Sequence, residues 1–317
     1  MPTSTPLRVG VIGPAGFGGS YLSVELINRG HTVIGISRNP QKLGKHERYI
    51  PRPVDIVELS FTELAKYFED INVLVSEYGP HTGGADALLY MPFLEAVRKI
   101  VLAVKLSPVQ YFLFVGGAGS LHVPGTHECC VDHPDFFMAY RRAIATSEAH
   151  ISYMEERLGV MGTALRTYKD ARLAQKEGRA TEKDEAAIAE YEKSVNKKDR
   201  ATDFIKAGRT AFMFFDGNES FRWSFVSPSA LYRPGKRTGK YVVTVDDMEL
   251  EGEQKEGESV FEGRLTGISV ADMAIAIADE IESEKLVWKH WGATGNISED
   301  LPAPAYVYLD SVEGGSK

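Results

Sequence analysis

Cysteine is scarce in this sequence of 317 residues, which has only Cys129 and Cys130. Adjacent cysteines are poorly placed to form a disulfide with each other, and two thiols are too few for a structural zinc site. Basic residues are also in the minority, since 36 Lys and Arg stand against 44 Asp and Glu, for a net charge of −8. Without a basic field, we expect no binding to nucleic acid or to an anionic membrane surface.

Long apolar runs are lacking as well. No stretch reaches the roughly 20 apolar residues that a membrane helix needs, and the opening MPTSTPLRV has no basic segment followed by an apolar run. These absences, with so little cysteine, favour a soluble cytoplasmic protein in a reducing compartment. The 43% of hydrophobic residues suffice for a well-filled core.

Short β-branched runs alternate with helical patterns through the first half of the chain. Residues 7–12, 31–37, 54–59, 72–78 and 110–115 are predicted strands, and residues 21–28, 61–68, 85–102 and 136–158 are predicted helices. This alternation is typical of a parallel sheet covered by helices on both faces. The predicted fold class is therefore α/β, with a doubly wound, Rossmann-type sheet.

The alternation stops at residues 166–203, which are dense in charged residues and alanine. This composition predicts exposed helix. Three roles stay open for it: a solvated helical extension, a lid over the substrate, or an oligomer contact, as in a homodimer. We therefore expect a Rossmann core (1–158), a charged helical insertion (159–220) and a C-terminal substrate-binding part of the same domain (221–317).

Sheet patterns return in the C-terminal part, at residues 221–235 and 239–247. Residues 267–283 then have helical spacing behind Ser269, with Asp272 three positions on, which predicts a capped helix. The last residues, Pro-rich and then Gly-rich, are expected to pack only in part.

The stretch VGVIGPAGFGGSYL holds a glycine motif between the first strand and the first helix. Gly13, Gly16 and Gly19 match the spacing G-x-x-G-x-x-G, with Gly18 as an extra glycine. In such a unit the first glycine allows a tight turn, the second lets a pyrophosphate approach the backbone, and the third lets helix and strand pack closely. The helix N-terminus adds N–H donors and partial positive charge, so the motif predicts a dinucleotide site.

The end of the second strand bears on the choice of dinucleotide. A site that prefers NAD usually has Asp or Glu there to bind the ribose 2′-OH, but this chain has Ser37, Arg38 and Asn39, with Lys42 beyond. A guanidinium can hold a 2′-phosphate through charge-assisted hydrogen bonds. We therefore predict NADP(H), although Arg38 and Lys42 could also be plain surface charges.

These motifs, together with FLFVGGAGSLHVPG, WSFVSPSALYRPGKRTGKY and GISVADMAIAIADEIE, resemble the atypical short-chain dehydrogenases/reductases of the NmrA-like, NAD(P)H-binding type, which include NADH-flavin reductases. The resemblance covers residues 7–158 and 221–291. It implies a set of cofactor contacts. The pyrophosphate would contact Gly13, Gly16, Phe17, Gly18 and Gly19, and the ribose with its phosphate would contact Ser37 and Arg38. The middle of the cofactor would border Tyr78, Gly79 and Pro80, and the two sides of the nicotinamide would lie near Gly116 and Gly117 and near Pro228 and Ser229.

The catalytic signature of that superfamily is incomplete here. Its members use a serine and a Y-x-x-x-K motif, in which the lysine lowers the pKa of the tyrosine that protonates the substrate. By resemblance Ser120 takes the place of the serine and Tyr140 that of the tyrosine, but Ile144 stands where the lysine is expected. His122, in the loop after Ser120, is a further candidate because histidine titrates near neutral pH.

Three functions stay open for a small-molecule substrate. The first is a reductase in which NADPH delivers hydride to a carbonyl, enone, imine or quinone. The second is a non-redox isomerase or cyclase that keeps NADP bound, and the third is an NADP-sensing regulatory protein. The missing lysine favours the last two, whereas Ser120 and Tyr140 favour an enzyme.

Overall fold

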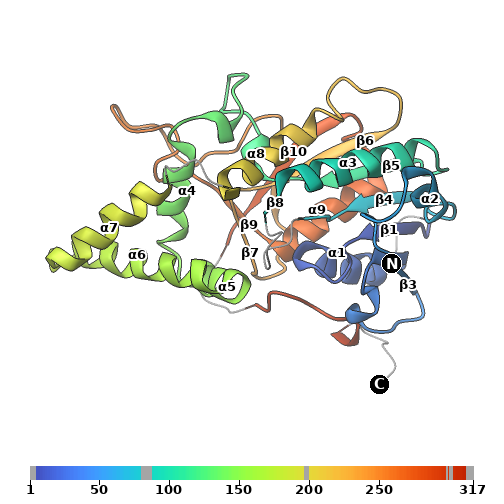
Figure 1. The fold of residues 1–317 in the computed structure, drawn as a ribbon, viewed down its shortest axis with the longest axis horizontal. Coiled ribbons are helices and arrows are strands. Elements are labelled where there is room, and N and C mark those ends of the chain that lie inside the picture. The colour runs from blue at the N-terminus through green and yellow to red at the C-terminus, as the bar shows by residue number, and fades with distance from the viewer. Residues whose placement is uncertain (1–4, 80–87, 196–199, 298, 300–302, 312–317) are drawn as a thin grey trace.

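One mixed sheet runs through the protein, in the order β3-β2-β1-β4-β5-β6-β10-β8 (Figure 1). The computed structural model describes residues 5–79, 88–195, 200–297, 299 and 303–311. Every neighbouring pair in this sheet is parallel except β10 and β8. The chain begins in the middle of the sheet and winds outward in both directions, so the predicted Rossmann-type fold is confirmed. The strands are β1 (Arg8–Ile12), β2 (Thr32–Ser37), β3 (Tyr49–Pro53), β4 (Val73–Ser76), β5 (Tyr111–Val115), β6 (Trp223–Pro228), β8 (Tyr241–Val245) and β10 (Lys289–Gly295).

Two helical layers cover the sheet. Helices α1 (Phe17–Asn28) and α9 (Val270–Ser283) pack on one face, and α2 (Phe61–Lys66), α3 (Tyr90–Lys105) and α8 (Arg200–Phe212) on the other. Alternate strand residues enter the two cores, as Val11 lies under α1 and α9 while Ile12 lies under the second layer. No helix in the described part of the chain is long and apolar enough to span a bilayer.

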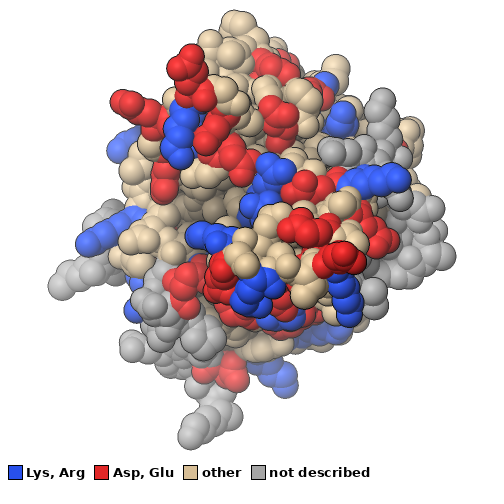
Figure 2. Space-filling view, turned by 90° about the vertical axis from the view of Figure 1, so that its left-hand side faces the viewer, with Lys and Arg blue, Asp and Glu red and all other residues tan. Residues whose placement is uncertain are grey.

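A helical arm extends from one end of the sheet (Figure 1). It consists of α4 (Phe136–Ile144), α5 (Glu148–Leu158), α6 (Val160–Lys176) and α7 (Glu182–Val195), so the charged stretch is mostly helical, as predicted. The rings of Tyr168 and Tyr191 stack with centroids 4.3 Å apart and join α6 to α7. Acidic and basic side chains are interspersed on this side of the molecule (Figure 2), which is typical of a solvated surface.

Two predicted elements were placed wrongly, and two strands were missed: β9 (Gly267–Ser269), which lies inside a predicted helix, and β10. The third strand is Tyr49–Pro53 and not residues 54–59, because its two prolines are tolerated on the edge strand that it forms. The helix predicted over 136–158 is two helices, since Ser147 starts the second by accepting a hydrogen bond from the His150 amide at 3.0 Å. Strand β10 was missed because its sequence, KHWGATG, has no β-branched run.

The C-terminal part of the chain adds a small second sheet, helix α9 and the tail. Strands β7 (Leu231–Arg233) and β9 (Gly267–Ser269) pair in a small sheet, and the predicted cap of α9 is confirmed, with Ser269 Oγ accepting from the Asp272 amide at 3.0 Å. The Asp272 carboxylate accepts hydrogen bonds from the amides of Thr238 and Gly239, which lie outside the helix. The tail packs through buried Leu309 and a hydrogen bond from the Tyr21 hydroxyl to a backbone carbonyl.

The tip of the arm should be dispensable for folding. None of the described residues between 169 and 190 belongs to either core of the main sheet. Because the rings of Tyr168 and Tyr191 are in contact, a short Gly-Ser linker can join these residues in place of 169–190. We expect this deletion to keep cooperative unfolding in a circular-dichroism melt. Ala211→Glu is the control, because it buries a charge under the sheet and should abolish folding; non-cooperative melting of the deletion variant would contradict the prediction.

Candidate functional site

A cavity of about 730 Å³ opens where the carboxyl ends of β1, β2, β4 and β5 meet the N-terminus of α1. In a doubly wound sheet this is where the strand order reverses and ligands bind. The cavity collects most residues of the predicted cofactor set, namely Gly13, Gly16, Phe17, Gly18, Ser37, Arg38, Tyr78, Gly79, Gly116 and Gly117. Pro80 lies outside the described residues, and Gly19, Pro228 and Ser229 do not line the cavity.

The glycine turn brings α1 close to the end of β1. Gly13 has a φ of +82°, and its carbonyl accepts a hydrogen bond from the Gly16 amide at 3.0 Å. A Cβ on Gly19 would lie 2.1 Å from that carbonyl oxygen, so this glycine serves close packing and not ligand contact. Gly16, the N-cap residue, has no side chain to satisfy the first N–H groups of α1, which leaves them to an anion such as a diphosphate.

The end of the cavity next to β2 holds one cation and one acid. Arg38 is an exposed lining residue directly after β2. Asp55, in the segment after β3, lines the same end and raises the pKa of Tyr78, although burial is the larger cause of that shift. Asp55 was not predicted from the sequence, because it stands 17 positions beyond Arg38 and away from the end of β2, where an acid was sought.

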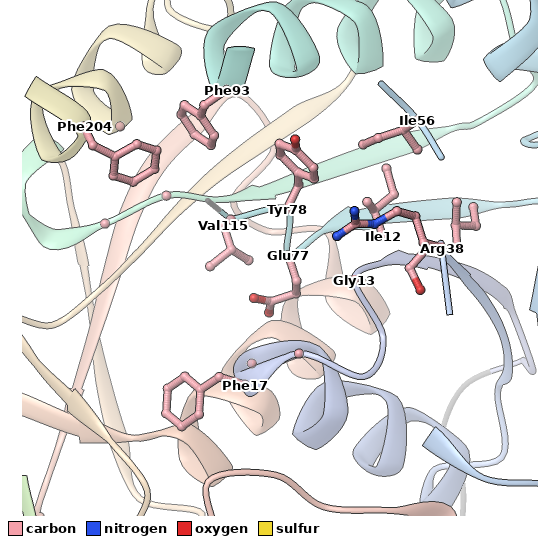
Figure 3. Close-up of a pocket in the computed structure, with 18 of the residues that line it drawn as sticks. Ile12, Gly13, Phe17, Arg38, Ile56, Glu77, Tyr78, Phe93, Val115 and Phe204 are labelled. Carbon is pink, nitrogen blue, oxygen red and sulfur yellow. The ribbon is translucent and has the colours of Figure 1, made fainter. Parts of the chain in front are cut away.

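The centre of the cavity contains a carboxylate that was also missed from the sequence. Glu77 follows β4 directly, and its side chain points into the cavity between Phe17 and Val115 (Figure 3). Burial raises the pKa of this carboxyl group to about 8. Its Oε1 is shielded from solvent and has no hydrogen-bond partner among the described residues. The motif YGP next to it was the signal that could have drawn attention to this position.

The opposite end of the cavity is aromatic. Tyr140 on α4, Tyr232 on β7 and Tyr306 in the tail line it, and α8 adds Phe204. Much of this wall comes from segments after the nucleotide-binding half of the chain.

One cation, Arg157 at the end of α5, also belongs to this aromatic wall. Its guanidinium lies 5.8 Å from the ring centroid of Phe17, and its Nη1 donates to the Tyr153 hydroxyl at 2.7 Å. This end can therefore hold a planar, partly polar molecule.

Of the three predicted catalytic residues, the structure brings only Tyr140 to the cavity wall. Ser120 is 2% exposed, donates a hydrogen bond to the Gly117 carbonyl at 2.7 Å, and lies 2.9 Å from the Ser227 hydroxyl. Ser227 in turn lies 2.9 Å from Nε2 of His290, whose pKa burial lowers to about 3. Ser120, Ser227 and His290 thus form a chain of hydrogen bonds that stabilises the loop beneath the cavity.

His122 lies away from the cavity and forms β-bridges with Cys129 and Asp247. Its ring lies 6.2 Å from that of His127, measured between centroids, and neither histidine lines the cavity. In the described residues, no three side chains of His, Cys, Asp or Glu gather as a metal site would require.

Comparison with known proteins bears on this geometry. Residues 13–157 match the family described as NAD(P)H-binding, so the resemblance inferred from the sequence is confirmed at that level. The protein YwnB of Bacillus subtilis (strain 168) is 24% identical over 279 residues, which are 87% of this chain and 92% of YwnB.

Two solved structures share the fold. A protein from Bacteroides thetaiotaomicron, to which an epimerase role is ascribed, gives a TM-score of 0.60 at 23% identity over 92% of this chain and 97% of that chain. A protein from Streptococcus pneumoniae, to which an NADH-flavin reductase role is ascribed, gives a TM-score of 0.58 at 18% identity over 92% of this chain and 100% of that chain.

The contact between Gly13 and Gly19 can be tested by adding one methyl group. We expect Gly19→Ala to lower the free energy of unfolding by about 1–3 kcal/mol, because the new Cβ would overlap the Gly13 carbonyl and push α1 away. Gly208→Ala is the matched control, since a Cβ on this helical glycine of the cavity wall would meet no atom of the described residues within 4 Å. It should be neutral or stabilising by about 0.5–1 kcal/mol. Equal urea midpoints for the two variants would contradict the packing argument.

Proposed function

We propose that this chain, whose residues 13–157 match the NAD(P)H-binding family, is an NADP(H)-dependent reductase of a small organic carbonyl, enone, imine or quinone. One observation carries the proposal: a single cavity joins the glycine turn and Arg38 at one end to Tyr140 and an aromatic wall at the other. A bound nicotinamide would supply hydride to the substrate. The residues of this chain would bind the dinucleotide, orient the substrate and donate a proton to it.

The preference for the 2′-phosphate rests on Arg38 and Ser37. Both line the cavity at the end of β2, where a hydroxyl and a guanidinium suit a phosphate and no carboxylate follows directly in the chain. Asp55 lies at the same end and suits a ribose hydroxyl. Arg38 therefore decides the choice between the two dinucleotides.

Replacing Arg38 tests this choice. We expect the native protein to bind NADPH at least tenfold tighter than NADH, a difference of about 1.4 kcal/mol. Arg38→Ala should remove most of that difference by weakening NADPH more than NADH, because NADH lacks the 2′-phosphate that the guanidinium is proposed to bind. Dissociation constants from calorimetry would decide, with Arg98→Ala as control, since this exposed arginine of α3 is not among the lining residues. Equal affinities for NADPH and NADH in the native protein would refute the preference.

Tyr140 is the proton donor that best fits the proposal. Its side chain lines the substrate end of the cavity, within the same pocket as Gly116 and Gly117. The lysine of the Y-x-x-x-K motif is replaced by buried Ile144, but the Arg141 guanidinium lies 5.5 Å from the centroid of the Tyr140 ring. A cation therefore lies over the ring of Tyr140, although it does not occupy the position of the lysine.

The walls of the cavity serve to hold the substrate and to exclude water. Phe17, Phe93 and Phe204 come from α1, α3 and α8, and their rings form apolar surface around the opening. Such a wall orients a planar acceptor and strengthens the hydrogen bond from Tyr140 by lowering the local dielectric.

Loss of the Tyr140 hydroxyl should impair turnover and leave cofactor binding intact. We expect Tyr140→Phe to lower turnover about tenfold or more with an unchanged affinity for NADPH, because the hydroxyl acts on the substrate. Ser120→Ala is the comparison variant: its hydroxyl is turned toward Ser227, so a smaller effect is expected. The measurement is NADPH oxidation across a panel of carbonyls, enones and quinones.

Other outcomes of that panel assign the other functions. Product formed without net oxidation of NADPH would identify a non-redox isomerase or cyclase. Tight nucleotide binding with no product from any acceptor would identify a nucleotide sensor. A large effect of Ser120→Ala, with none from Tyr140→Phe, would transfer the role of donor to Ser120.

A further inference from the structure

Glu77 occupies an unusual place for a carboxylate. A Cβ on Gly18 would lie only 2.5 Å from Glu77 Oε2, so the carboxyl group rests against the first turn of α1. The Glu77 backbone is equally close to the glycine turn, because a Cβ on Gly13 would lie 3.1 Å from the Glu77 carbonyl oxygen. In this fold the first turn of α1 is where the diphosphate of a dinucleotide binds. The acid and the diphosphate therefore share one small region of the cavity.

Nothing in the surrounding described residues compensates a charge on Glu77. Its carboxylate has no hydrogen bond or ion pair among them, and burial alone accounts for the rise of its pKa to about 8. The titratable or charged groups that share the cavity are Arg38 after β2, Asp55 after β3, Tyr78 next in the chain, Tyr140 on α4, Arg157 on α5, Tyr232 on β7 and Tyr306 in the tail. Of these, Tyr232 has a pKa that is raised mainly by burial and further by the charge of the Glu77 carboxylate.

A charged Glu77 would oppose the binding of a diphosphate. Two anions held a few ångströms apart in a site shielded from water repel each other strongly. A protonated carboxyl group removes the repulsion and also gains an O–H donor, which a phosphate oxygen can accept.

We propose that Glu77 binds the dinucleotide as a neutral acid: its protonated carboxyl group donates a hydrogen bond to the diphosphate, and the ionised form excludes it. A molecule of protein that starts with Glu77 ionised takes up one proton from solvent when the dinucleotide binds, and releases it when the dinucleotide leaves. The inference rests on dinucleotide binding by this family and not on the proposed reductase activity.

The test measures NADPH affinity between pH 7 and pH 9.5, where the 2′-phosphate is largely ionised. For the native protein, affinity should fall about tenfold per pH unit once Glu77 ionises, because binding then requires one proton. Calorimetry at pH 8.5 in two buffers of different ionisation enthalpy should report an uptake approaching one proton. Adenosine 2′-monophosphate, which lacks the diphosphate, should bind with no such dependence.

Three variants separate the charge from the hydrogen bond. Glu77→Gln keeps a donor of the same shape without the charge, so it should bind NADPH at pH 7 within a few-fold of the native protein and show no decline up to pH 9.5. Glu77→Ala should also show no decline but bind more weakly. Asp55→Asn, an acid-to-amide change in the same cavity, should keep the native pH dependence.

Stability of the free protein gives a readout that does not involve the ligand. The pKa of Glu77 is raised from its ordinary 4.5, so the native state binds the proton more tightly, and stability falls as pH rises from about 4.5 to about 8. The melting temperature of Glu77→Gln should therefore exceed that of the native protein by more at pH 8 than at pH 5.

Several results would overturn the proposal. One is the same pH dependence of NADPH affinity in the native protein and in Glu77→Gln. Another is a flat native profile with Glu77→Gln weakened at pH 7, which would mean that the ionised carboxylate accepts a hydrogen bond from a ribose hydroxyl. Absence of NADPH binding at every pH would contradict dinucleotide binding itself, whereas binding without turnover would contradict only the reductase.

Discussion

The close approach of α1 to the end of β1 is the constraint on which the site depends. It requires a positive φ at Gly13 and no side chain at Gly19, where a Cβ would lie 2.1 Å from the Gly13 carbonyl oxygen. This contact sets where the free N–H groups of α1 point and how far they lie from the ends of β2 and β4. The place of Glu77 against the first turn of α1 depends on it, because the Glu77 carboxyl group lies next to Gly18.

The rest of the cavity is assembled from distant parts of the chain. Helices α4 and α5 contribute Tyr140 and Arg157, α8 contributes Phe204, and the tail contributes Tyr306. The end at the glycine turn is thus built by local structure near the start of the chain, and the aromatic end by the tertiary packing of separate segments, β7 among them. A cavity of this kind allows its aromatic wall to change without disturbing the glycine turn.

Buried polar groups form hydrogen bonds with one another beneath these segments. Ser120, Ser227 and His290 form a hydrogen-bonded chain, and burial keeps the histidine neutral by lowering its pKa to about 3. On the other face, the Tyr111 hydroxyl donates to Glu280 at 2.6 Å. The hydroxyls of Ser120, Ser227 and Tyr111 have partners inside the protein, whereas Nδ1 of His290 and Oε1 of Glu77 have none among the described residues. Of these two unpartnered atoms, only that of Glu77 belongs to a residue that lines the cavity, where a ligand can serve as its partner.

Local patterns along the sequence were enough to predict the doubly wound sheet, the glycine turn and the cap of α9 by Ser269, because each depends on the spacing of neighbouring residues. They were not enough for β3, which keeps two prolines by lying at the sheet edge, or for β10, which pairs through backbone groups that any sequence offers. Whether Ser120 faces a substrate or another serine, and whether a glutamate after β4 finds a partner, depends on which distant surfaces meet. Burial and hydrogen bonding between such surfaces exist only in the tertiary structure, and they determine which side chains face the cavity and which are buried.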